Sequence, residues 1–134
     1  LRNPCSYGKR TGGSVQLTEL IKKAGRVYLC GNGGSAANAI HIANDLISVG
    51  VKAHALTADV ATLTAIANDF SYEEVFSRQL RVFGDVGDLL IALSGSGTSK
   101  NIVDAILTAN NLGMTTVGVF GAFNKDATKI AAHT

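Results

Sequence analysis

Apolar positions along this chain alternate between short continuous runs and longer stretches with helical spacing. The continuous runs predict strands at 26–30, 52–56, 88–93 and 115–120. The spaced stretches predict helices at 17–23, 35–48, 60–67, 72–81 and 99–111. Ser35 and Asp59 stand where they would cap two of these helices, and Gly50 and Gly113 where they would end two.

Strands that alternate with helices predict a three-layer α/β fold. In this fold right-handed crossovers make a doubly wound parallel sheet, covered by helices on both faces. With 134 residues, the chain is expected to be a single domain. Residues 1–16 hold three glycines and the only proline, so we expect an irregular N-terminal segment. Beyond a helical turn expected at 125–132, we expect the C-terminal strand and helix of such a domain to be missing.

Two loops rich in glycine and serine are the candidates for chemistry. Gly31–Ser35 follows the first predicted strand, and Ser94–Ser99 follows the third. Backbone N–H groups at the start of a helix favour an anion, and ligands of open α/β sheets bind beyond the carboxyl ends of the strands. Two such loops predict a ligand with a phosphate at one end and polar groups along the rest.

Composition and charge narrow the classes of function and the cellular locations expected of this chain. Twelve basic and ten acidic residues give a net charge of only +2, which does not indicate nucleic-acid binding. No apolar run approaches the roughly 18 residues of a membrane span, and no signal peptide is visible, so a cytoplasmic location is expected. Cys5 and Cys30 have unlike surroundings and do not predict a disulfide framework.

A dinucleotide-binding turn is an alternative for the first loop. Gly31, Gly33 and Ala36 have the spacing of the glycine fingerprint in its alanine-ended form. That fingerprint also needs an acid at the end of the second strand to hold a ribose, and none occurs before Asp59, which is better placed as a cap. The fingerprint also leaves the second loop unexplained, so NAD is disfavoured.

Three blocks of the sequence together resemble a known family. These are 29–46 (LCGNGGSAANAIHIANDL), 68–78 (NDFSYEEVFSR) and 93–101 (LSGSGTSKN). In this order they resemble sugar isomerase (SIS) domains, specifically the phosphoheptose isomerase branch. The resemblance implies a flavodoxin-like fold and a homo-dimer or homo-tetramer whose sites are shared between subunits. It also implies conversion of sedoheptulose 7-phosphate to a heptose 7-phosphate, through an enediol, for lipopolysaccharide or another surface polysaccharide.

The resemblance also assigns site residues. Three hydroxyls and two backbone N–H groups of the second loop would hold the phosphate: Ser94, Ser96 and Ser99, with Gly95 and Thr98. Residues of the first loop would line the sugar, and two residues of the second block would bind its hydroxyls: Asn32, Gly33, Gly34 and Ser35, with Asn68 and Asp69.

The main departure from the family concerns catalysis. Asp45 stands where the family's isomerases usually have a glutamate, the proposed proton-transfer base and metal ligand, and its side chain is about one methylene shorter. His41 matches a position that binds zinc in some members. The family's later catalytic histidine and glutamine belong to a C-terminal helix that we do not find in this chain, and His133 comes too early to be that histidine.

Simpler interpretations stay open beside these. Either loop is compatible with an ordinary turn, and Asp69 with a cap of the next helix. His41 and Asp45, four residues apart, suit a metal or a local hydrogen bond equally. A structural role is expected of His54. Solvated helix faces are expected of the pairs Lys22–Lys23 and Arg78–Arg81. Two other functions also remain: a catalytically silent sugar-phosphate sensor, and a partner protein like the SIS relatives that bind a replication initiator.

Overall fold

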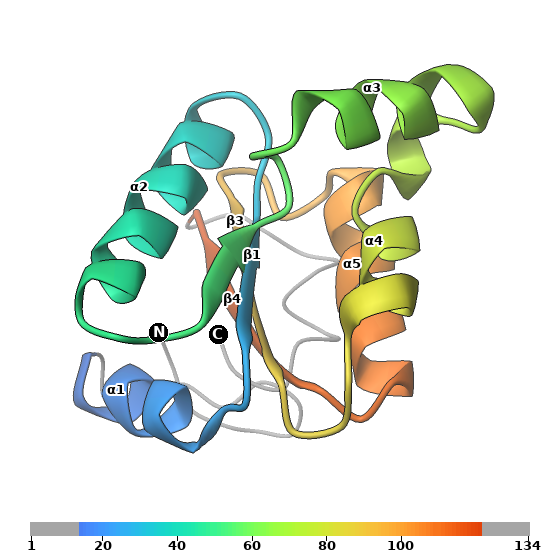
Figure 1. Ribbon diagram of the computed structural model, residues 1–134. Coiled ribbons are helices and arrows are strands. Elements are labelled where there is room, and N and C mark those ends of the chain that lie inside the picture. The colour runs from blue at the N-terminus through green and yellow to red at the C-terminus, as the bar shows by residue number, and fades with distance from the viewer. Residues whose placement is uncertain (1–13, 122–134) are drawn as a thin grey trace.

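A parallel sheet forms the centre of the molecule (Figure 1). The structure is a computed structural model, and it describes residues 14–121. The four strands are β1 (Val27–Cys30), β2 (Ala53–Ala55), β3 (Leu89–Ser94) and β4 (Thr115–Phe120). All pairs are parallel, in the order β2-β1-β3-β4. This order, together with the helices on both faces, confirms the doubly wound, flavodoxin-like sheet.

Helices cover both faces of this sheet. They are α1 (Ser14–Lys23), α2 (Gly34–Ser48), α3 (Val60–Asp69), the 3₁₀ turn η1 (Tyr72–Glu74), α4 (Ser77–Phe83) and α5 (Lys100–Asn111). In Figure 1, α1 and α2 lie to the left of the sheet, α4 and α5 lie to its right, and α3 lies near the top. The predicted three layers are therefore confirmed.

Two apolar clusters, one on each side of the sheet, hold these layers together. Successive residues of a strand point to opposite faces, so Tyr28 and Leu90 pack with Ile106 of α5 while Leu29 and Ile91 pack with Ala39 of α2. Every residue of β1 and β3 is buried. Burial on both faces explains why these strands are continuous apolar runs rather than alternating ones.

The ends of the elements differ from the sequence prediction in three places. Ser35 does not cap α2: Gly33 is the N-cap, with a φ of 55° that L side chains rarely adopt. The helix predicted over 72–81 is divided into η1, whose Val75 N–H bonds Tyr72 O in a 3₁₀ pattern, and α4, which begins at Ser77. Helix α1 begins at Ser14, so residues 14–16 are helical rather than irregular.

Other predicted boundaries are confirmed. Asp59 caps α3, since its carboxylate accepts the Thr62 N–H at 3.2 Å. Gly50 and Gly113 have φ values of 88° and 82° directly beyond the ends of α2 and α5. The expected turn at 125–132, with Cys5 and His133, lies outside the described residues.

Candidate functional site

The two glycine- and serine-rich loops meet where the strand order reverses. From β1 the chain moves outward to β2 and then crosses back to β3, on the other side of β1. Such a switch point opens a crevice at the carboxyl ends of the two central strands. A cavity of about 140 Å³ lies there, lined by Asn32, Ser35, Leu93, Ser94, Gly95, Ser96 and Ser99. Six of these seven residues were predicted site residues.

The second loop keeps its serine oxygens in place with its own backbone. The buried Ser94 Oγ accepts the Gly97 N–H at 3.0 Å, and Ser96 Oγ accepts the Thr98 N–H at 3.2 Å. A hydroxyl that accepts a hydrogen bond still has its proton to donate. Both serines therefore keep a donor for a ligand. The Thr98 N–H, in contrast, is already used within the loop, and Thr98 does not line the cavity.

The two loops are joined by a pair of side-chain amides. Asn32 Nδ2 donates to Asn101 Oδ1, and Asn101 Nδ2 donates to Asn32 Oδ1, each at 2.9 Å. The Tyr72 hydroxyl also donates to Asn32 Oδ1, at 2.8 Å. Sequence reasoning did not assign Asn101 or Tyr72 to the site. A buried asparagine in the first turn after the second loop was the available signal for Asn101, whereas nothing in the local pattern distinguished Tyr72.

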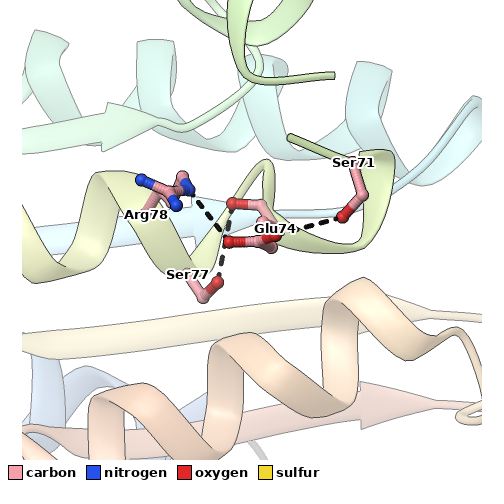
Figure 2. Close-up of polar contacts among 4 residues, drawn as sticks. All are labelled: Ser71, Glu74, Ser77 and Arg78. Carbon is pink, nitrogen blue, oxygen red and sulfur yellow. Dashed lines mark hydrogen bonds and ion pairs between the residues drawn. The ribbon is translucent and has the colours of Figure 1, made fainter. Parts of the chain in front are cut away.

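The segment that carries Tyr72 is held by a polar cluster (Figure 2). Glu74 Oε1 accepts from Arg78 Nε at 2.9 Å, and Glu74 Oε2 accepts from the Ser71 hydroxyl at 3.4 Å. The Arg78 guanidinium also lies 3.3 Å from the centre of the Phe70 ring, a cation–π contact. Arg78 is therefore a structural residue of this turn and not part of a simply solvated face.

The glycines of the first loop serve different purposes. A Cβ on Gly31 would come within 2.8 Å of backbone atoms of Ser35, so only glycine fits between the end of β1 and the start of α2. A Cβ on Gly34 or Gly95 would meet nothing within 4 Å. Packing therefore explains Gly31, whereas the backbone at Gly34 and Gly95 faces open space that a ligand can approach.

The thiol directly before the first loop is chemically inert. Cys30 is a free cysteine, fully buried at the end of β1. Burial raises the pKa of its thiol to about 12. Because the thiolate is the reactive form, Cys30 is no nucleophile near neutral pH.

Two predicted sugar-binding residues lie outside the cavity. Asn68 and Asp69 are exposed at the end of α3, where Asn68 Nδ2 donates to Asp69 Oδ1 at 3.1 Å. Neither residue lines the cavity. The alternative that Asp69 caps the next helix is wrong, because Ser71 is the N-cap of η1.

The candidate base and metal ligand form an exposed pair on α2. His41 Nε2 lies 3.3 Å from Asp45 Oδ2, with side-chain exposures of 76% and 65%. Asp45 comes ten residues after Ser35 in the same helix, which places it about 15 Å further along the axis. Neither His41 nor Asp45 lines the cavity of its own chain.

This pair does not complete a metal site by itself. Zinc takes at least three protein ligands in catalytic sites and four in structural ones. Within residues 14–121, no group of three or more histidine, cysteine, aspartate or glutamate side chains is placed to hold an ion. His41 and Asp45 would thus supply only two ligands.

A larger cavity lies elsewhere, beside the edge strand β2. It measures about 490 Å³ and is lined by residues that include Arg26, Lys52, His54 and Phe83. His54 is exposed there and makes an edge-on contact with the Phe83 ring, with centroids 6.4 Å apart. Neither glycine-rich loop contributes to this cavity, so the smaller one at the switch point is the better candidate.

Comparison with known proteins places this geometry in a family. The sequence model of the SIS domain matches residues 13–121. The chain belongs to the SIS domain family. This membership accounts for the two loops at the switch point of a flavodoxin-like sheet, as the sequence blocks predicted. Among the helices of the described part of this SIS domain, none is long and apolar enough to cross a membrane.

Individual relatives are phosphoheptose isomerases. That of Roseiflexus sp. (strain RS-1) is 46% identical over 113 residues, which are 80% of this chain and 57% of the relative. The structure of phosphoheptose isomerase GmhA from Neisseria gonorrhoeae has a TM-score of 0.78 and 38% identity, covering 89% of this chain and 70% of that one. The phosphoheptose isomerase from Francisella tularensis has a TM-score of 0.76 and 31% identity, with the same coverage. The SIS domain described here spans little more than half the length of the curated relatives it matches, for example 57% and 58%.

Proposed function

We propose that this SIS domain is the sugar-phosphate-binding core of a phosphoheptose isomerase. The observation that carries the proposal is the cavity between the two loops, lined by serine hydroxyls at the start of α5. The phosphoheptose isomerases at 38–46% identity support the same activity. The proposed substrate is sedoheptulose 7-phosphate, and the product is a heptose 7-phosphate.

In this proposal the second loop binds the phosphate. Ser94, Ser96 and Ser99 donate hydroxyl protons to it, and the positive end of the α5 dipole adds attraction. Gly95, and Thr98 once its N–H leaves Ser96, would add backbone donors. Binding energy from the phosphate, which does not react, would position the other end of the sugar for the chemical step.

The sugar then extends over the first loop. Asn32 and Ser35 would donate to its oxygens, and the open backbone at Gly33 and Gly34 allows a close approach. Asn68 and Asp69, exposed at the end of α3, would bind hydroxyls on the part of the sugar that extends out of the cavity.

The proposed chemistry is aldose–ketose isomerisation through an enediol. A carboxylate takes the proton from the carbon beside the carbonyl, and the electron pair moves to form the enediolate. The carboxylic acid then returns that proton to the former carbonyl carbon, while the neighbouring hydroxyl gives its proton to the former carbonyl oxygen and itself becomes the aldehyde. Asp45 is the proposed base, and hydrogen-bond donors around the cavity would stabilise the enediolate charge.

The exposed position of Asp45 on α2 supports a role for it on a ligand held by another subunit. The base is about 15 Å from the cavity of its own chain along α2, yet proton transfer needs hydrogen-bond reach. Ile40 and Ile47 are also exposed on this helix, and a partner subunit packed there would cover them. We therefore propose a homo-oligomer, a dimer or tetramer, in which α2 brings His41 and Asp45 to the cavity of a partner copy.

Mixing two inactive variants of the full-length protein tests this arrangement. Asp45→Asn removes the base, and Ser94→Ala with Ser96→Ala disables the cavity. If the sites are shared across a two-fold interface, co-refolding the two variants in equal amounts should restore about a quarter of the unmutated activity, since half the dimers are mixed and each has one intact site.

The controls separate the possible outcomes. Each variant refolded alone should stay inactive with sedoheptulose 7-phosphate. Activity that never returns on mixing would mean that the base is not supplied by a partner. If the unmutated protein binds the sugar phosphate but exchanges none of its carbon-bound protons with solvent, the silent-sensor alternative replaces the isomerase.

A further inference from the structure

We propose that Tyr72 and Asn101 are positioning residues that orient the Asn32 amide. They turn its oxygen toward the protein and leave an N–H to face the ligand. Neither residue lines the cavity, so both act through Asn32. The inference rests on the proposed function only in taking a sugar phosphate as the ligand of the cavity.

The bonds of Asn32 leave one spare donor. Its Oδ1 accepts from both Asn101 Nδ2 and the Tyr72 hydroxyl, which occupies both of the oxygen's lone pairs. Its Nδ2 carries two hydrogens, and one of them goes to Asn101 Oδ1. The second hydrogen is available to the cavity that Asn32 lines. Asn32 therefore offers an N–H group to the ligand and favours a ligand oxygen that can accept a hydrogen bond.

Asn101 gives this arrangement a rigid support. Its side chain is 3% exposed, in the first turn of α5 directly after the second loop. Leaving a buried amide without partners costs about 1–3 kcal/mol, so its bonds to Asn32 are strongly retained. Because the two asparagines are 69 residues apart in the sequence, their bonds also tie the first loop to the second.

Tyr72 decides between two orientations of the amide pair. If both amides turned over together, the pair would form the same two hydrogen bonds, with the Asn32 oxygen toward the ligand. The Tyr72 hydroxyl makes the two orientations unequal in energy. Its oxygen is a weak acceptor because its electrons are shared with the ring, so the hydroxyl bonds better to the Asn32 oxygen than to the Asn32 N–H group. Glu74 and Arg78 hold the turn that carries Tyr72 (Figure 2), which keeps the hydroxyl in reach of Asn32.

The test compares the loss of two tyrosine hydroxyls. Tyr72→Phe removes the bond to Asn32, while Tyr28→Phe, the matched control, removes a bond to Phe83 O away from both loops. Calorimetry with sedoheptulose 7-phosphate should show affinity about three- to tenfold weaker for Tyr72→Phe, the effect of one hydrogen bond. The control should bind as the unmutated protein does.

Nuclear magnetic resonance of the free protein supplies a second, independent measurement. In Tyr72→Phe the side-chain amide signals of Asn32 and Asn101 should shift and exchange between two states, whereas in Tyr28→Phe they should not move. Amide signals and affinity that are the same in both variants would overturn the inference. If the unmutated protein binds no sugar phosphate, the proposed function fails, and the amide signals still decide the orientation of Asn32.

Discussion

The cavity between the loops and the His41–Asp45 pair on α2 are built in opposite ways. Around the cavity, side chains are held by hydrogen bonds from several elements, as Asn32 is held by Asn101 and Tyr72. The His41–Asp45 pair has one mutual contact and is largely exposed to solvent. One chain therefore contains a candidate binding site whose side chains are held in place, whereas its candidate base is exposed.

This difference predicts that ligand binding and catalysis depend on separate groups of residues. If the proposal is right, changes at the cavity should act mainly on affinity, and changes on α2 mainly on turnover. The serines of the second loop and the His41–Asp45 pair share no hydrogen-bond partner, so their effects on stability should be nearly additive.

The largest effect is expected from the base. Asp45→Asn keeps the size of the side chain but removes the proton acceptor, and should lower turnover of sedoheptulose 7-phosphate by about 10²- to 10⁴-fold. Affinity measured by calorimetry should change little, because the cavity is about 15 Å away along the helix.

Two further variants test whether the loss of turnover is specific to the carboxylate at position 45. Asp45→Glu should retain or raise activity, because the longer side chain restores the reach of the family's usual residue. Asp85→Asn, the same chemical change in the loop between α4 and β3, should leave turnover unaffected. Full turnover in Asp45→Asn would place the base elsewhere.

The next largest effect is expected from the phosphate loop. Ser94→Ala with Ser96→Ala removes two donors to a charged group, each worth about 1.5–3 kcal/mol, so affinity for sugar phosphate should fall about 100-fold or more. Ser48→Ala, whose hydroxyl bonds Asp45 O at the exposed end of α2, is the control and should bind normally. Unchanged affinity in the double variant, with an intact circular dichroism spectrum, would contradict the assignment.

Much of this site could be predicted from local sequence. Central parallel strands are buried on both faces and so leave continuous apolar runs, as 88–93 shows. The loops beyond them were found because glycine and serine directly after such runs mark a turn into a helix. Both loops around the cavity follow from these two signals, and the resemblance to SIS domains assigned the six residues within them.

The other features of the site could not be predicted, because they depend on contacts that leave no pattern in the local sequence. The bond between Asn32 and Asn101 joins residues 69 positions apart, and Tyr72 reaches Asn32 from a turn whose shape the periodicity did not predict. Ser35 was taken for a cap because its residue type is typical of one, but the N-cap is Gly33, two positions earlier, which has a positive φ. Asp45 is 65% exposed, and its local sequence does not show whether its side chain faces the cavity or the solvent.

The smallest effect tests whether the chain itself shapes the first loop. A Cβ on Gly31 would overlap backbone atoms of Ser35, and relief of such overpacking typically costs about 1–3 kcal/mol. Gly31→Ala should therefore lower the free energy of unfolding by that amount in urea titrations. Gly34→Ala is the matched control: its Cβ would meet nothing within 4 Å, and alanine is the better helix former, so stability should hold or rise by up to about 1 kcal/mol. Equal destabilisation by both variants would mean that the loop is not shaped by the contact between Gly31 and Ser35. If only Gly31→Ala lowers the free energy of unfolding, contacts within one chain shape the first loop of the cavity before any ligand or partner is present.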